Sequence, residues 1–175
     1  MAGLPRVLVT RKLPDAVLAR LARDFDTVFN PNDTLYDAES LIEHSQDCEA
    51  LLICGTDKLT AEVIQRLSTK IRVIATFSVG YEHIDIDAAN ARNIIVTNTP
   101  GVLNAATADL TMMLMLGASR RASEGEAMIR DGRWAGWSPT GMLGTDLTGK
   151  TLGIFGMGEI GRAVARRAHG FCMNV

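Results

Sequence analysis

Three glycines near residue 160 have the spacing of a phosphate-binding turn. Gly156, Gly158 and Gly161 form the pattern GxGxxG within TLGIFGMGEIGRAVARRAHG. In this pattern the first glycine permits a tight turn, the second lets the backbone approach a pyrophosphate, and the third allows close helix–strand packing. A helix that begins at the turn adds unpaired N–H groups and a partial positive charge. The pattern predicts a dinucleotide site, with close packing alone as the alternative.

The residues expected to bind the cofactor at this turn are Gly156, Met157, Gly158, Glu159, Ile160 and Gly161. A predicted strand, Thr151–Phe155, precedes them and a helical pattern follows, which is the context this motif needs. Glu159 is an objection, because a carboxylate at the anion-binding end disfavours phosphate unless it points away.

The unit that holds this turn is expected to be incomplete. A ribose-binding acidic residue should follow the first glycine by about 20 residues, which lies past the 175 residues of the chain. A complete β-α-β unit takes roughly 30 residues, and 25 are present from Thr151 onward. We therefore expect the start of a Rossmann domain, truncated.

A second candidate site lies at residues 77–85, FSVGYEHID, directly after the predicted strand Ile71–Thr76. Ligands bind at the carboxyl edge of an open parallel sheet. Gly80 leaves backbone N–H groups free to face an anion such as a carboxylate, although an ordinary loop explains the sequence equally well. His83 could act as a general acid, but a polar residue just before the predicted helix cap Asp85 is the better interpretation.

Alternating strands and helices over residues 1–98 position this loop. The expected strands are Arg6–Thr10, Thr27–Asn30, Ala50–Ile53, Ile71–Thr76 and Asn93–Asn98, and the expected helices are Pro14–Phe25, Ala38–His44, Ala61–Leu67 (capped by Thr60) and Ile86–Arg92. Such alternation indicates right-handed β-α-β units and a parallel sheet. The predicted fold class is α/β, with a flavodoxin-like parallel-sheet lobe.

Residues 99–175 are expected to form a second, incomplete domain. Pro100-Gly101 suits the centre of a type II turn and so a domain crossing. A nearly all-apolar helix is predicted at Ala105–Arg121, with Asn104 as its cap. A helix that is apolar all round is normally buried, so we expect it to lie between two lobes. A shorter helix is predicted at Ser123–Gly132.

Composition excludes several classes of function. The net charge of −2 gives no electrostatic case for binding nucleic acid or an anionic membrane. Cys48, Cys54 and Cys172 form no CxxC pair, so we expect no metal site and a reducing, cytoplasmic setting. The amino terminus does not fit a signal peptide, and no apolar run approaches the ~20 residues of a membrane span.

Four segments together resemble one enzyme family. They are SVGYEHIDIDAA (Ser78–Ala89), NTPGVLNAATADLT (Asn98–Thr111), GRWAGWSP (Gly132–Pro139) and LTGKTLGIFGMGEIGRAVARRAHGF (Leu147–Phe171). In this order they resemble the amino-terminal part of the D-isomer-specific 2-hydroxyacid dehydrogenases, and the third segment resembles the glyoxylate/hydroxypyruvate reductase branch. The resemblance implies an oxidoreductase that transfers a hydride between NAD or NADP and a small 2-keto or 2-hydroxy acid. It also implies a homodimer.

The resemblance assigns roles to particular residues. Val79 and Gly80 match the loop whose N–H groups hold the substrate carboxylate and face the nicotinamide. Thr107 matches a position that contacts the cofactor near its phosphates. Many relatives have arginine where this chain has Glu159, so only backbone binding is expected there. The family's catalytic histidine, glutamate and arginine match no position here, so we expect no catalytic residue within this chain.

Three interpretations remain open from the sequence. The chain is the amino-terminal part of a longer dehydrogenase, inactive and poorly soluble alone. Alternatively, it belongs to a non-catalytic NAD(H)-sensing or partner-binding protein on the same scaffold. A third interpretation is a native short protein that pairs its exposed strand with another chain.

Overall fold

A computed structural model describes residues 3–175 and divides into two units, each with its own apolar core. One unit ends at Pro100 and the other begins at Gly101. The first contains every named strand and four helices, and the second contains three helices. The two predicted sites therefore fall in different units.

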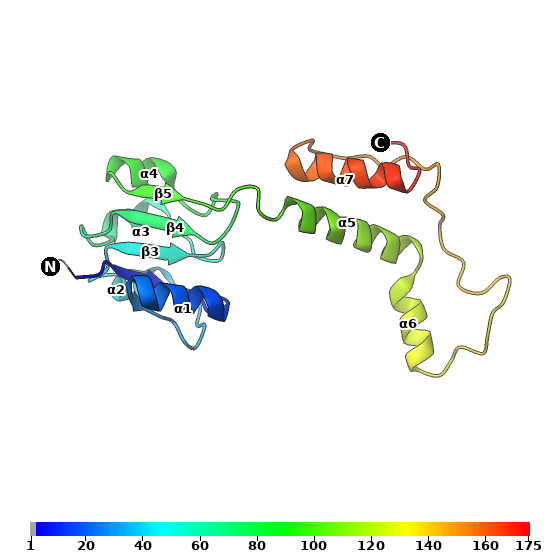
Figure 1. Ribbon diagram of the computed structural model, residues 1–175, viewed down its shortest axis with the longest axis horizontal. Helices are drawn as coiled ribbons and strands as arrows, with labels where there is room; N and C mark the ends of the chain where they lie inside the picture. Colours follow the sequence, from blue (N-terminus) through cyan, green and yellow to red (C-terminus); the bar gives the residue numbers. More distant parts are fainter. Residues whose placement is uncertain (1–2) are drawn as a thin grey trace. The chain divides into compact units, whose positions relative to one another are not determined.

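The first unit is built on a five-stranded parallel sheet in the order β2-β1-β3-β4-β5 (Figure 1). Its strands are β1 (Arg6–Val9), β2 (Asp26–Val28), β3 (Ala50–Ile53), β4 (Val73–Thr76) and β5 (Ile95–Thr97). This is the strand order of flavodoxin-like doubly wound folds. The predicted α/β class and parallel lobe are confirmed.

Side-chain caps fix where three of the four helices of this unit begin. The helices are α1 (Asp15–Asp24), α2 (Ala38–His44), α3 (Ala61–Arg66) and α4 (Ile86–Ala91). Asp37, Thr60 and Asp85 each accept a hydrogen bond from a backbone N–H in the first turn of α2, α3 and α4 respectively. Each cap typically stabilises its helix by about 1 kcal/mol. The predicted caps Thr60 and Asp85 are confirmed.

Alternate residues of β1 pack on opposite faces of the sheet. Leu8 joins a core cluster with residues of α2, α3 and α4. Val7 and Val9 join a second cluster with α1, whose Leu18 and Leu21 are only partly buried. Burying both faces of a central strand is typical of parallel sheets, which need helices on each side.

The second unit is held together by two helices packed against each other. Its helices are α5 (Asn104–Ser119), α6 (Ala122–Arg130) and α7 (Glu159–Gly170). Figure 1 shows α5 and α7 side by side. Ala108 and Met112 of α5 meet Ala163 and Val164 of α7 in a small buried cluster. None of the helices within residues 3–175 has both the length and the apolar composition needed to cross a bilayer.

Two predictions about α5 are wrong. The helix begins at Asn104 itself, which is therefore inside the first turn, and it has no side-chain cap. The Asn104 amide donates to the Glu159 carboxylate on α7. The helix is also not buried all round. Leu110, Met113 and Leu114 are 52%, 59% and 61% exposed, because α7 covers only the side that carries Ala108.

The predicted strand at Thr151–Phe155 is reduced to a single parallel bridge, between Thr151 and Asn174. A strand needs a partner that extends alongside it. Here the backbone hydrogen bonds to the last residues of the chain are made by Gly149 N, Leu152 N and Lys150 O, and none involves residues 153–155. Phe155, at the end of this segment, is fully exposed. The segment has the sequence of a strand but lacks the pairing that would make it one.

Candidate functional site

Three consecutive carbonyl groups of the loop after β4 are bound by the protein. Ser78 O accepts from Thr99 N at 3.0 Å, and Val79 O accepts from the Asn98 side-chain amide at 2.8 Å. Gly80 O accepts from the Ser78 hydroxyl at 2.7 Å. The C=O and N–H of a trans peptide point in opposite directions. The bonds at Ser78 O and Val79 O therefore turn the N–H groups of Val79 and Gly80 away from Thr99 and Asn98.

The N–H groups of Val79 and Gly80 are left without acceptors. None of the hydrogen bonds within residues 3–175 uses either of them as a donor, although both residues are half-buried. Partly buried backbone donors normally find a partner. Two successive donors of this kind form a concave site that suits an anion.

A cavity of about 530 Å³ adjoins this loop. Its lining includes Gly55 and Lys58 after β3, and Gly80, Glu82 and His83 after β4. Its charged lining residues are Lys58, Glu82 and Asp85, of which Lys58 and Glu82 are exposed. The cavity is thus open, carries a few charged side chains and lies at the carboxyl edge of the sheet, where small ligands bind in this fold.

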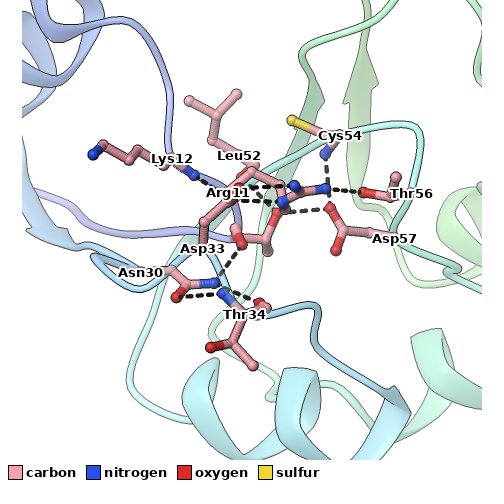
Figure 2. Close-up of polar contacts among 10 residues, drawn as sticks. Arg11, Lys12, Asn30, Asp33, Thr34, Leu52, Cys54, Thr56 and Asp57 are labelled. Carbon is pink, nitrogen blue, oxygen red and sulfur yellow. Dashed lines mark hydrogen bonds and ion pairs between the residues drawn. The ribbon is translucent and has the colours of Figure 1, made fainter.

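The buried carboxylate of Asp57 joins the carboxyl ends of the neighbouring strands β1 and β3. Asp57 is only 2% exposed, and it accepts from the Thr10 hydroxyl at 2.7 Å and from Cys54 N at 2.8 Å (Figure 2). A buried charge is costly unless it is hydrogen-bonded. The two bonds therefore fix the loop after β3 to the end of β1.

An exposed ion pair extends this network. Arg11 places its Nε and Nη2 on the two carboxylate oxygens of Asp33, at 2.7 and 3.0 Å, and its Nη1 on the Thr56 hydroxyl at 2.8 Å (Figure 2). The Arg11 hydrogen bonds, with one from Lys12 N, hold the pKa of Asp33 well below its usual range. The loops after β1, β2 and β3 are thereby tied together beside the candidate site.

In the second unit, Gly156, Gly158 and Gly161 each have the backbone geometry expected for their position in the GxGxxG turn. Gly156 has a φ of +100°, a conformation that other residues rarely adopt. A Cβ at Gly158 would meet nothing within 4 Å. A Cβ at Gly161 would overlap the Gly156 carbonyl oxygen and lie 3.4 Å from Ile154 Cγ2. The turn needs a backbone conformation suited to glycine at its first position, is open at its second and is tightly packed at its third.

The amino end of α7 carries unpaired donors. No side chain caps the helix. None of the backbone hydrogen bonds outside helices and strands in residues 3–175 is donated by an N–H between Met157 and Gly161. Unpaired first-turn N–H groups together with the helix dipole attract anions. This end of α7 fits a phosphate group.

The other predicted cofactor residues differ in what they offer. Glu159 has its carboxylate bound by Asn104 of α5, which holds the side chain in place but leaves its negative charge at this end of the helix. Ile160 packs into the α5–α7 cluster, which leaves only its backbone to a ligand. Met157 is 51% exposed. Thr107 is half-buried on α5, and its carbonyl accepts from the Thr111 hydroxyl.

Comparison with known proteins identifies the family. The model of the family described as "D-isomer specific 2-hydroxyacid dehydrogenase, catalytic domain" matches residues 7–169 of the chain. The chain belongs to this family. The family resemblance predicted from the sequence is confirmed.

Relatives in the 2-hydroxyacid dehydrogenase family are similar over nearly the whole chain. It is 44% identical to a glycerate dehydrogenase of Hyphomicrobium methylovorum over 97% of this chain and 53% of the relative. It is also 44% identical to a glyoxylate reductase of Korarchaeum cryptofilum, over 98% and 52%. A crystal structure of a putative NAD-binding D-isomer specific 2-hydroxyacid dehydrogenase from Polaromonas sp. JS6 66 matches with a TM-score of 0.91 and 44% identity, over 97% of this chain and 53% of that one. The chain thus spans about half the length of the dehydrogenases it matches.

Asn98 and Thr99 were missed as part of the site, although they hold two of the three loop carbonyls. A signal for them was present, since β5 pairs in parallel with β4 and residues after neighbouring parallel strands meet at one edge.

No group of three or more His, Cys, Asp or Glu side chains suited to a metal ion occurs among the described residues.

Proposed function

We propose that this chain is the amino-terminal half of an NAD(P)-dependent 2-hydroxyacid dehydrogenase. Residues 1–98 are its substrate lobe, and residues 99–175 are the crossing helix and first β-α unit of its cofactor domain. The observation that carries the proposal is the pair of acceptor-free N–H groups at Val79 and Gly80, in a chain of this family. The glycine turn before α7 supports it independently.

In this proposal the loop after β4 binds the substrate. The N–H groups of Val79 and Gly80 donate to its carboxylate, which fixes the orientation of the neighbouring C2 atom. Donors whose carbonyls are already held need little reorganisation when an anion arrives. Glyoxylate and hydroxypyruvate are the proposed substrates, supported by the names of the relatives, which include glyoxylate reductases and a glycerate dehydrogenase.

The turn from Gly156 to Gly161 binds the pyrophosphate of NAD or NADP through its backbone, with Thr107 of α5 as a further contact. When bound, the nicotinamide supplies the hydride. The open space at Gly158 is what a closely approaching phosphate requires. Glu159 is engaged by Asn104 and brings no positive charge to the turn, so the binding energy comes from the backbone and the helix dipole.

Proton transfer has to come from outside this chain. Hydride transfer to a keto group also requires a general acid, and the family's histidine, glutamate and arginine match no residue here. We therefore propose that the 175-residue chain alone is inactive, and that the whole protein is a cytoplasmic homodimer with α5 near the subunit contact. The exposed Leu110, Met113 and Leu114 on α5 support such a contact.

The test compares this chain with the extended protein, meaning the chain followed by its natural downstream sequence. We expect NAD(P)H oxidation with glyoxylate or hydroxypyruvate from the extended protein only. Cofactor binding without reduction of any 2-keto acid would refute the enzyme and favour a sensor. A stop codon directly after Val175 would refute the proposal that a second half exists.

A further inference from the structure

Three side chains around the substrate loop form a continuous chain of hydrogen bonds. His83 Nε2 lies 3.0 Å from the Thr76 hydroxyl, which lies 2.6 Å from the Ser78 hydroxyl. The Ser78 hydroxyl in turn donates to Gly80 O at 2.7 Å. We call these residues the relay. It connects the last residue of β4 to the middle of the loop and to the residue just before the bridge at Ile84.

The direction of every bond in the relay follows from counting protons. A hydroxyl has one proton to donate. Ser78 uses its proton on Gly80 O, so Thr76 must donate to Ser78. Thr76 then has none left, so His83 must donate from Nε2. The relay thus fixes the neutral imidazole of His83 as the tautomer with its proton on Nε2.

Both ends of the relay are anchored. Thr76 is 2% exposed and paired within the sheet. The carbonyl of His83 accepts from Leu59 N at 2.9 Å, and Ile84 forms a parallel bridge with Leu59. The relay therefore ties the substrate loop to the end of β4 and, through the His83 backbone, to the loop after β3.

The relay restrains the residue of the loop with the greatest freedom. Glycine has the widest choice of φ and ψ, and Gly80 provides one of the two proposed carboxylate donors. The peptide before Gly80 is held at Val79 O by Asn98. The peptide after it is held at Gly80 O by the relay. With both neighbouring peptides held, little rotation is left to Gly80.

We propose that Thr76, Ser78 and His83 are positioning residues for the substrate carboxylate. They act through the Gly80 backbone and do not touch the substrate. This inference rests on the proposed function of the Val79–Gly80 loop. It gives His83 a purpose other than acid catalysis, and it accounts for the buried Thr76 hydroxyl, which bonds to no other group within residues 3–175.

The kinetic test uses matched pairs of variants in the extended protein. Thr76→Val removes the hydroxyl at nearly constant shape, whereas Thr76→Ser keeps it. His83→Leu removes the donor, whereas His83→Gln offers an amide N–H at the position of Nε2. We expect the first member of each pair to raise KM for glyoxylate about three- to tenfold, the range for one lost hydrogen bond, with KM for NAD(P)H and kcat within about twofold. The second member should restore most of the affinity.

A structural role alone would give another pattern. Melting temperatures would fall while KM for glyoxylate stayed constant in the folded enzyme, and that result would overturn the proposal. Failure of His83→Gln to restore KM would overturn it as well. The His83 pair keeps the test decisive if Thr76→Val does not fold, because His83 is half-buried and lies outside the sheet.

A spectroscopic arm separates this inference from the proposed function. In the ¹⁵N-labelled 175-residue chain, the neutral ring of His83 should carry its proton on Nε2. A proton on Nδ1 would refute the relay whatever the extended protein catalyses. An extended protein that shows the Nε2 tautomer but reduces no 2-keto acid would instead refute the proposed function, and with it the role for substrate.

Discussion

Replacing Gly158 by alanine should weaken cofactor binding while leaving the fold intact. The residue has a φ of −72° and a ψ of −163°, which alanine adopts without strain. A Cβ there would meet no atom within 4 Å. Alanine is a poorer N-cap than glycine, so we allow a change of up to about 1 kcal/mol in the free energy of unfolding. The space that the methyl group would take is the space we assign to the pyrophosphate.

The other two glycines of the turn are the matched controls. Gly156→Ala would hold alanine at a φ of +100°, a strain of about 1–3 kcal/mol. Gly161→Ala would press a methyl group against the backbone of Gly156, and such overpacking costs about 1–3 kcal/mol, partly offset by about 1 kcal/mol of helix propensity. Gly156→Ala should lower the melting temperature by roughly 2–12 °C and Gly161→Ala by up to roughly 8 °C, at about 2–4 °C per kcal/mol.

The assay measures stability and affinity on the same samples of the extended protein. Thermal melting without cofactor gives the stability, and a fluorescence titration with NADH or NADPH gives the affinity for the cofactor. For Gly158→Ala we expect a roughly 5- to 100-fold weaker Kd, equivalent to about 1–3 kcal/mol of overpacking against the ligand. Its melting temperature should stay within about 3 °C of the parent, at the same conversion from free energy.

Two results would refute this reasoning. An unchanged Kd for Gly158→Ala would mean that the pyrophosphate does not approach this residue. A melting temperature for Gly161→Ala above that of the parent, as helix propensity alone would give, would mean that the close contact between α7 and the turn does not exist.

Three further predictions concern the 175-residue chain. Thr10→Val removes a donor from the buried Asp57 and should lower the free energy of unfolding by about 1–3 kcal/mol, measured by urea denaturation with Thr10→Ser as the control that keeps the hydroxyl. Asp33 has a lowered pKa in the folded state because of Arg11. The stabilisation that it gives is complete above the unfolded pKa of about 3.9 and is lost as the pH falls below that value. Asp33→Asn should therefore reduce the difference in the free energy of unfolding between pH 5 and pH 3, and an undiminished difference would contradict the assignment. Finally, the purified chain should oxidise neither NADH nor NADPH with glyoxylate or hydroxypyruvate, and any measurable turnover would disprove its inactivity.

The sequence predicted the first unit well because its local signals and its packing agree. All five strands and all four helices of that unit were expected, including the cap residues Thr60 and Asp85. The errors lie at boundaries. Ile71 is buried but lies outside β4, since apolar character reports burial and not pairing. Asn93 was placed in the fifth strand, yet its φ of +57° is incompatible with extended backbone.

The candidate sites were only partly predictable. Position after a strand and the presence of glycine pointed to Gly80, and the family resemblance added Val79, but none of these reveals whether an N–H has an acceptor. That property depends on Asn98, Thr99 and Ser78, which hold the carbonyls from two different loops. The partners of a backbone group are a property of the folded arrangement, and hydrogen bonds across about 20 residues of sequence leave no periodic signal of the kind that marks a helix or a strand.

The failures in the second unit have a different origin. The pattern at Thr151–Phe155 is that of a buried strand, yet Phe155 is fully exposed. The pattern of α5 is that of a buried helix, yet Leu110, Met113 and Leu114 are each more than half exposed. In both segments the residues are apolar enough for a core, and the described residues provide too few partners to form one around them.

Both mismatches have one physical cause. An apolar pattern predicts that a segment will be buried, whereas the structure shows whether the described residues provide enough packing partners to bury it. In the first unit the two agree, so its core is closed by its own elements. In the second unit α5 and α7 cover each other on one side only, and large exposed apolar surfaces mark places where further protein packs. The chain spans about half the length of its relatives, so we expect the second half of the protein to cover Phe155 and a partner subunit to cover the exposed side of α5.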